Sequence, residues 1–247
     1  MIIKTGFITG KINGITVNSS IKCNSANYNT RASRDVKYIV MHYTGNPKDT
    51  AKANCNYFKT GSRKASAHFF VDDNNIYQSV ELKNIAWHCG GTNYYHSTCR
   101  NSVAFGIEMC CTAGNYTVSA KTIKNSTYLC AKLCEMLGIT ADQVDTYVLR
   151  HYDITHKSCP AQMANGAKDP DWIAFKEQVK SILKGAKKLP YLVKITADEL
   201  NVRAGAGTSY KVNTVVKKDE VYTIVEEKDG WGKLKSGAGW ISLMYTK

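Results

Sequence analysis

The chain has 247 residues, of which 43% are hydrophobic and 21% charged, and its formal net charge is +13. This length is sufficient for one large domain followed by a small one. The apolar runs fall well short of the roughly 20 residues that a transmembrane helix needs, which excludes a protein built on membrane spans. The positive charge favours an anionic partner, but the sequence shows neither a zinc-finger pattern nor an arginine-rich helix that would favour nucleic acid.

The cysteines and the N-terminus bear on the compartment in which the chain is made. Nine cysteines occur, and no two have the C-x-x-C spacing of closed metal cages and redox motifs. Residues 1–10 contain neither a continuous apolar segment nor a small-residue cleavage site, so no secretory signal is predicted. We therefore expect synthesis in a reducing cytoplasm, where disulfides are rare.

The first half of the chain alternates between β-rich and helical patterns. Residues 1–34 are polar and predict at most one edge hairpin. A strand over 36–42 ends in His42, and Asp49 or Thr50 then caps a helix that runs to about Lys59, with Ala53, Tyr57 and Phe58 on its apolar face. Two β-rich runs, 65–71 and 76–80, are joined by Asp and Asn residues and predict a hairpin.

Residues 103–110 form a nearly continuous apolar run that is interrupted by Glu108. Such a run is typical of a strand buried on both faces, where a lone carboxylate is costly unless it has a purpose. A helix over 122–138 closed by Gly138, a strand over 146–149 and a helix over 172–183 follow. Together these elements predict an α/β domain over 1–186, with a mixed β-sheet and flanking helices.

The pattern changes after a linker at 187–190. Short β runs separated by Gly, Asp and Lys predict a small all-β barrel over 191–247. The runs are 200–203, 212–216, 221–225, 231–234 and 239–241.

Two histidines and a cysteine form a candidate metal site. His42 and His151 each follow a β-rich run, and the loop that begins at His151 returns a thiol at Cys159. Two histidines and one cysteine, with a fourth position open, make up the ligand count of a catalytic zinc rather than a structural one. Either histidine alone is equally well explained as a hydrogen-bonded residue at the end of a strand.

Four separated segments and this histidine–cysteine pair occur in an order that resembles the zinc N-acetylmuramoyl-L-alanine amidases, whose fold also occurs in peptidoglycan-recognition proteins. The segments are 38–44, 67–69, 86–88 and 105–108, and the resemblance covers most of residues 28–183. It implies cleavage of the bond between N-acetylmuramic acid and L-alanine in peptidoglycan, with one Zn²⁺ held by His42, His151 and Cys159.

The resemblance also implies roles for residues around the metal. Glu108 would take a proton from the attacking water and pass it to the departing L-alanine amine, while Lys157 would face the scissile carbonyl. His88, Trp87 and Asn93 are the candidates for substrate binding. The chain departs from some relatives at Ala67, where they carry tyrosine, and at Cys159, where they carry aspartate.

Residues 191–247 resemble a bacterial SH3-like cell-wall-binding module. The landmarks are 200–205, 208–210, 230–231 and 239–241. Trp231, Trp240, Tyr210 and Arg203 are the candidates for wall contact, although both tryptophans would also suit the barrel core. The expected partners are peptidoglycan and anionic wall polymers, with no nucleic acid.

An amidase followed by such a module has the layout of a phage endolysin or a host autolysin. The missing signal sequence favours an endolysin that is made in the host cytoplasm and reaches the wall through membrane holes formed by another protein. Two other classes stay open at this point. One is a peptidoglycan-binding protein without catalytic activity, and the other is a cytoplasmic regulator that binds nucleic acid through its basic surface.

Overall fold

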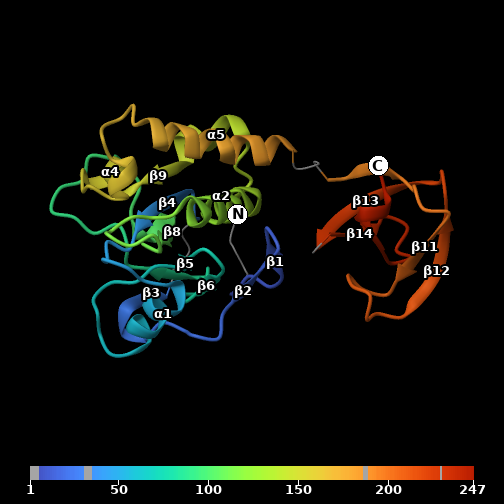
Figure 1. Cartoon of the computed structure of the whole chain (residues 1–247), viewed down its shortest axis with the longest axis horizontal. Helices are drawn as coiled ribbons and strands as arrows, with labels where there is room; N and C mark the ends of the chain where they lie inside the picture. The colour runs from blue at the N-terminus through green and yellow to red at the C-terminus, as the bar shows by residue number, and fades with distance from the viewer. Residues whose placement is uncertain (1–5, 31–34, 186–188, 229) are drawn as a thin grey trace. The chain divides into compact units, whose positions relative to one another are not determined.

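The computed structural model describes residues 6–30, 35–185, 189–228 and 230–247, and the chain divides into two compact units, 1–185 and 186–247 (Figure 1). The predicted linker at 187–190 lies partly outside the described residues, so its boundaries stay a prediction. No described helix is long and apolar enough to cross a membrane.

The first unit is built on a seven-stranded sheet with the order β1-β2-β6-β5-β8-β4-β9. Strands β5, β8, β4 and β9 run parallel, whereas the β1–β2 and β5–β6 pairs are antiparallel, so the predicted mixed sheet and edge hairpin are confirmed. A separate two-stranded sheet pairs β3 (Tyr28–Thr30) with β7 (Asn84–Ala86). The strands of the main sheet are β1 (Lys11–Ile12), β2 (Ile15–Asn18), β4 (Tyr38–Tyr43), β5 (Phe69–Val71), β6 (Ile76–Gln78), β8 (Ala104–Met109) and β9 (Val148–Arg150).

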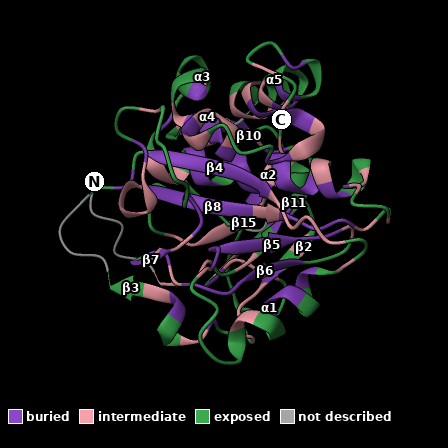
Figure 2. Ribbon diagram, turned by 90° about the vertical axis from the view of Figure 1, so that its left-hand side faces the viewer, coloured by how far each residue is buried: buried purple, intermediate pink, exposed green. Residues whose placement is uncertain are grey.

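The central strands bury both of their faces, as Figure 2 shows for β4 and β8. Because side chains alternate along a strand, one face packs on helices α2 (Ala120–Leu137) and α5 (Pro170–Gly185), and the other carries His42 and Glu108. Burying each large apolar side chain on the helix-facing side contributes about 1.5–3 kcal/mol. The central residues of that face are Ile39, Met41, Phe105 and Ile107.

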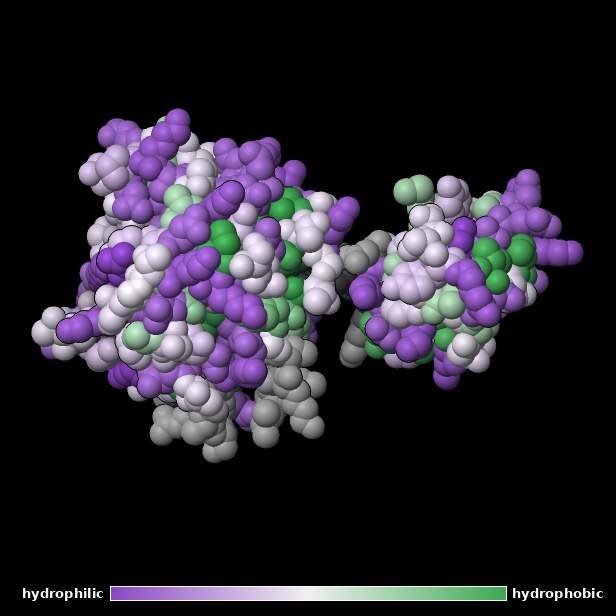
Figure 3. All heavy atoms as spheres, turned by 90° about the horizontal axis from the view of Figure 1, so that it is seen from below, coloured by the Kyte–Doolittle hydropathy of each residue, from purple (hydrophilic) through white to green (hydrophobic). Residues whose placement is uncertain are grey.

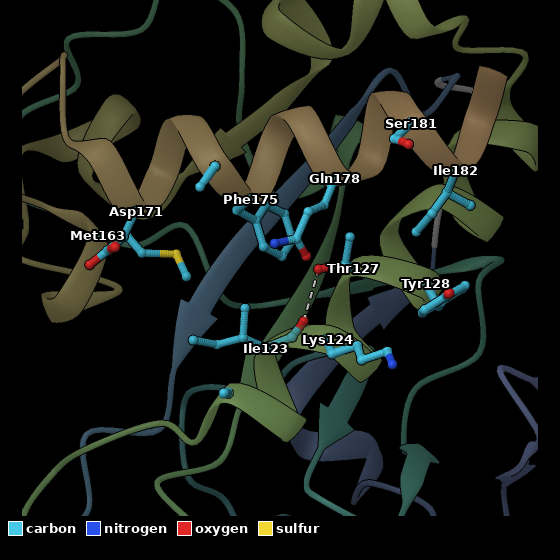
Figure 4. Close-up of a pocket in the computed structure, with 12 residues that line it drawn as sticks. Ile123, Lys124, Thr127, Tyr128, Met163, Asp171, Phe175, Gln178, Ser181 and Ile182 are labelled. Carbon is cyan, nitrogen blue, oxygen red and sulfur yellow. Dashed lines mark hydrogen bonds between the residues drawn. The ribbon is translucent and has the colours of Figure 1, made fainter. Parts of the chain in front are cut away.

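A groove lies between α2 and α5, on the side of the sheet that faces away from His42 (Figure 4). Its volume is about 520 Å³, and it is lined by residues of both helices together with Met163. Thr127 donates a hydrogen bond to the Ile123 carbonyl of its own helix, at 2.9 Å. Figure 3 shows apolar residues in small groups on a largely hydrophilic surface.

Helix ends largely follow the expected capping chemistry. Thr50 caps α1 (Ala51–Lys59) by accepting a hydrogen bond from the Ala53 N–H, and α2 ends at Gly138 in a left-handed conformation, with φ of 71°. The predicted apolar face of α1 is wrong for Ala53 and Tyr57, which are exposed, whereas Phe58 is half-buried and packs against the core. The buried face contains Asn54, whose amide bonds Asp49 and the Thr50 carbonyl and thereby interrupts the apolar period.

The segment before Cys159 differs from its prediction. Residues 144–147 form a short helix, α3 (Val144–Tyr147), so the strand β9 begins at Val148. His151 does not end this strand but begins α4 (His151–Thr155). The cause is the buried Arg150, whose backbone N–H and guanidinium both bond Asp153 and turn the chain into a helix at this point.

The second unit is a six-stranded antiparallel sheet with the order β10-β13-β14-β15-β11-β12, which confirms the predicted all-β unit. Its core contains Val193, Val202, Ile224, Leu234 and Ile241. The first strand, β10, lies outside the β runs that the sequence predicts. The strands are β10 (Tyr191–Lys194), β11 (Glu199–Arg203), β12 (Val212–Lys217), β13 (Val221–Lys228), β14 (Trp231–Leu234) and β15 (Trp240–Ser242).

Candidate metal centre

The three predicted ligands meet at the carboxyl ends of two parallel strands. His42 lies near the end of β4, and His151 directly follows β9, which pairs with β4. Cys159 returns to this point from the loop after α4, where its carbonyl accepts a hydrogen bond from the Tyr152 N–H. The carboxyl edge of a parallel sheet is where open α/β folds place their ligand sites.

The ligand atoms of His42, His151 and Cys159 all lie within 4.8 Å of one another, and all three residues are buried. The Cys159 Sγ lies 3.7 Å from the His42 Nδ1, and the two imidazole rings are 4.9 Å apart between centroids. Metal–ligand bonds to nitrogen and sulfur are about 2.0–2.3 Å, so one ion bonded to all three atoms fits this spacing. The group can therefore hold a metal ion.

Hydrogen bonds from Gly90 and His88, which form a second layer around the ligands, fix which ring nitrogens of His151 and His42 face the metal centre. The His151 Nε2 lies 2.8 Å from the Gly90 carbonyl, so this nitrogen carries the proton and the Nδ1 keeps its lone pair for a ligand. The His42 Nε2 lies 3.0 Å from the His88 Nδ1, while the other nitrogen of His42 faces Cys159. Such partners of metal-binding histidines orient the rings.

Gly106 on β8 makes this second layer possible. Its N–H donates to the His68 Nδ1 at 3.1 Å, and the His68 Nε2 bonds the Asn84 carbonyl at 3.2 Å. A Cβ atom at position 106 would lie 2.6 Å from the His88 Cγ, closer than any normal contact. Gly106 is absent from the predicted site residues, although a glycine inside a buried strand is a known signal for close approach.

Glu108 lies opposite His42 in the β8–β4 register, on the same face of the sheet. Its Oε2 is buried and has no hydrogen-bond partner among the described residues. Burial raises the pKa of Glu108 to about 8, Lys157 opposes this rise, and Asp49 adds to it. Lys157 itself is exposed. A carboxyl group with a pKa near neutrality can both accept and donate a proton.

The ligands themselves respond to burial in opposite ways. Burial, followed by the neighbouring His88 and His151, lowers the pKa of His42 well below its usual value and keeps the imidazole neutral. Burial and Glu108 raise the pKa of Cys159 to about 12, so the thiol keeps its proton unless a cation displaces it. Neutral imidazoles and a thiolate are the forms that bind metals, so this donor set fits a cation.

A second group of donors adjoins the first. The His88 Nδ1 lies 3.1 Å from the Cys89 Sγ, and His42, His88 and Cys89 together could also hold an ion. The separation of 3.0 Å between the two imidazole nitrogens is that of a hydrogen bond, so we assign these residues to the second layer.

The predicted substrate-binding residues lie in different settings. His88 is buried against His42, Trp87 is half-buried with its indole N–H donating to the Asn29 amide oxygen, and Asn93 is exposed. The contacts of His88 indicate that it orients His42. The assignment of all three residues to substrate stays a prediction.

Three of the predicted wall-contact residues in the second unit, Arg203, Trp231 and Trp240, lie on one outer face. Arg203 pairs with Trp240 across β11 and β15, and Trp240 pairs with Lys233, whose ammonium lies 5.8 Å from the indole centroid. Trp231 lies two positions from Lys233 on β14 and so shares its face. The Arg203 guanidinium also donates to the Tyr210 carbonyl at 2.7 Å.

The first unit is thus an α/β domain with a candidate metal centre at its sheet edge. The family model of N-acetylmuramoyl-L-alanine amidases matches residues 32–162, and that of bacterial SH3 domains matches residues 198–247. The chain therefore belongs to the N-acetylmuramoyl-L-alanine amidase family, with a C-terminal bacterial SH3 domain.

Individual relatives agree with this assignment. A probable N-acetylmuramoyl-L-alanine amidase of Bacillus licheniformis is 34% identical over 175 residues, which cover 68% of this chain and 48% of the relative. The chain thus spans about half the length of the curated relatives that it matches. The catalytic domain of XlyA matches with a TM-score of 0.54 and 27% identity, and a mutant endolysin from Bacillus subtilis with 0.54 and 28%. Both structures cover 67% of this chain and are themselves covered to 99%.

Proposed function

We propose that this chain is a zinc-dependent N-acetylmuramoyl-L-alanine amidase that its SH3 domain directs to the bacterial cell wall. The observation that carries the proposal is the buried His42–His151–Cys159 group, with the unpartnered Glu108 carboxyl beside it, in a chain of this family. Two nitrogens and one sulfur suit Zn²⁺, and three protein ligands leave a position for substrate or water.

Zinc, when bound, would polarise the amide carbonyl and lower the pKa of a water molecule. The chain's own residues would accept and donate the proton. Glu108 would receive a proton at its carboxyl group and deliver it to the nitrogen of L-alanine as the amide bond breaks, since an amine leaves far more easily than its anion. Burial raises the pKa of Glu108, the direction that favours a carboxyl group acting as the acid toward the leaving amine.

Lys157 would stabilise negative charge on the carbonyl oxygen. Its ammonium is exposed yet close enough to oppose the raised pKa of Glu108 and to lower the pKa of His42. An exposed ammonium can approach a substrate without a large desolvation cost, and its charge would act where the oxyanion develops.

The SH3 domain would supply the wall contact through Arg203, Trp231 and Trp240, with Lys233 beside them. Aromatic and cationic side chains on one face suit peptidoglycan or an anionic wall polymer. We further propose that the protein is a bacteriolytic endolysin, made in the host cytoplasm and released through membrane holes. A host autolysin would use the same chemistry.

The experiment measures bound zinc and the release of L-alanine-terminated peptides from purified Gram-positive cell walls. Wild type is compared with Glu108→Gln and with a matched surface variant, Glu135→Gln, which removes a carboxylate that pairs with Lys132 on α2. We expect zinc in all three proteins and a loss of at least about 100-fold in release for Glu108→Gln alone. If the wild type binds zinc but releases no peptide from the walls, the protein is instead a peptidoglycan-binding protein without catalytic activity.

A further inference from the structure

A second pocket lies on the side of the sheet that carries the metal centre, whereas the groove of Figure 4 lies on the other side of the sheet. Its volume is about 340 Å³, within the range of small-molecule sites, about 300–1,000 Å³. Glu108 is part of its lining, so the pocket reaches the proposed proton carrier directly. The other lining residues come from the β4–α1 loop, α1 and β5: Thr44, Asn46, Asp49, Ala53, Asn54, Tyr57, Phe58 and Phe70.

The polar residues of the lining offer hydrogen-bond acceptors and negative charge. The Asp49 carboxylate accepts hydrogen bonds from the amide groups of Asn46 and Asn54, each at 2.7 Å, and from the Cys111 N–H at 2.7 Å. The Asn54 amide also donates to the Thr50 carbonyl, so its N–H groups are used inside the protein. All these donors are neutral, and Asp49 forms no ion pair within the described residues, so its charge is not cancelled.

Other residues of the lining are apolar. Phe58 and Phe70 stack with their ring centroids 5.5 Å apart, and Ala53 also lines the pocket. Tyr57 is 52% exposed, and the Arg63 guanidinium lies 4.1 Å from the centroid of its ring. A ligand that matches both the polar and the apolar residues of the lining would combine an apolar portion with a cationic hydrogen-bond donor.

The direction of the reaction indicates which half of the substrate enters. If Glu108 delivers a proton to the leaving nitrogen, the group attached to that nitrogen lies on the Glu108 side, and this group is the peptide. We propose that this pocket holds the peptide half of the substrate and that Asp49 recognises a primary amine of that peptide. This inference rests on the proposed function. The amine is either the one freed at L-alanine by cleavage or one on a peptide side chain.

The test is calorimetric titration of the full-length zinc-loaded protein with product peptides, which an amidase no longer cleaves. The probe is the tripeptide L-Ala–D-Glu–L-Lys, compared with an analogue that has norleucine in place of lysine and with one acetylated at the N-terminus. Loss of the recognised amine should weaken binding about 3- to 10-fold, and the analogue that loses affinity identifies the amine.

A variant pair tests the pocket itself. Ala53→Phe places a ring into the pocket from the exposed face of α1, whereas Lys52→Phe puts the same ring on a neighbouring exposed residue outside the lining. Ala53→Phe should weaken tripeptide binding at least about 10-fold and Lys52→Phe should not. Thermal unfolding of both variants verifies that they fold.

The outcomes separate this proposal from the proposed function. Equal affinity for all three peptides overturns amine recognition, and unchanged binding by Ala53→Phe overturns the pocket. Wall hydrolysis without any binding of the tripeptide by wild type would leave the amidase intact and remove the subsite. Tripeptide binding that Ala53→Phe abolishes, in a protein that releases no peptide from walls, would keep the subsite and remove the amidase.

Discussion

Replacing Gly106 by alanine tests whether the second layer controls the metal centre. The new Cβ would lie 2.6 Å from the His88 Cγ and 2.8 Å from both its Cδ2 and Nδ1, whereas carbon atoms normally meet at about 3.5–4.0 Å. Gly106 sits in a central strand that is paired on both sides, so its backbone cannot retreat. The His88 ring must therefore move by about 1 Å, which would disturb its hydrogen bond with the His42 Nε2.

Loss of this hydrogen bond should weaken zinc binding about 10- to 100-fold, as is typical when the partner of a metal-binding histidine is removed. Overpacking should also lower the free energy of unfolding by about 1–3 kcal/mol. Zinc affinity is measured by competition with a chelator, and stability by denaturant titration. The matched control is Gly185→Ala at the end of α5, since no heavy atom lies within 4 Å of a Cβ there. Wild-type zinc affinity in Gly106→Ala would refute the proposed orienting role of His88.

Two further perturbations concern pH and domain organisation. Hydrogen-bonded ion pairs with Lys176 and Lys180 lower the pKa of Asp145 in the folded protein. The charged carboxylate therefore stabilises the folded protein at pH values above the pKa that Asp145 has in the unfolded chain. This stabilisation is lost as the pH falls through the lower pKa that Asp145 has in the folded protein. Because Asp145 is half exposed, we expect wild type to exceed Asp145→Asn in unfolding free energy by less than about 1 kcal/mol at neutral pH, and by nothing near pH 2. A difference that does not change with pH would contradict this. Residues 1–186 alone should cleave soluble fragments like the full chain but lyse cells at least about tenfold more slowly, because wall binding raises the local enzyme concentration. Equal lysis by both would remove any targeting role for the SH3 domain.

Much of the architecture follows from local patterns. The apolar run around Glu108 predicts a doubly buried strand, and the cap at Thr50 and the stop at Gly138 predict helix ends. These signals are local, since each depends on residues within one or two turns. Predictions failed where a buried polar group interrupts the period, as Asn54 does in α1 and Arg150 does before α4.

By itself, the sequence determined the chemical identity of the candidate ligands and the acid, because residue types fix which donors and protons are available. Only the tertiary structure decided how they are arranged. His42 and Cys159 are 117 positions apart, and His151 meets the Gly90 carbonyl across 61 positions. The choice of ring nitrogen, the space that Gly106 leaves for His88 and the acceptor-lined pocket beside Glu108 all arise from such long-range contacts. No local pattern encodes them, because they depend on which strands pair and in which register.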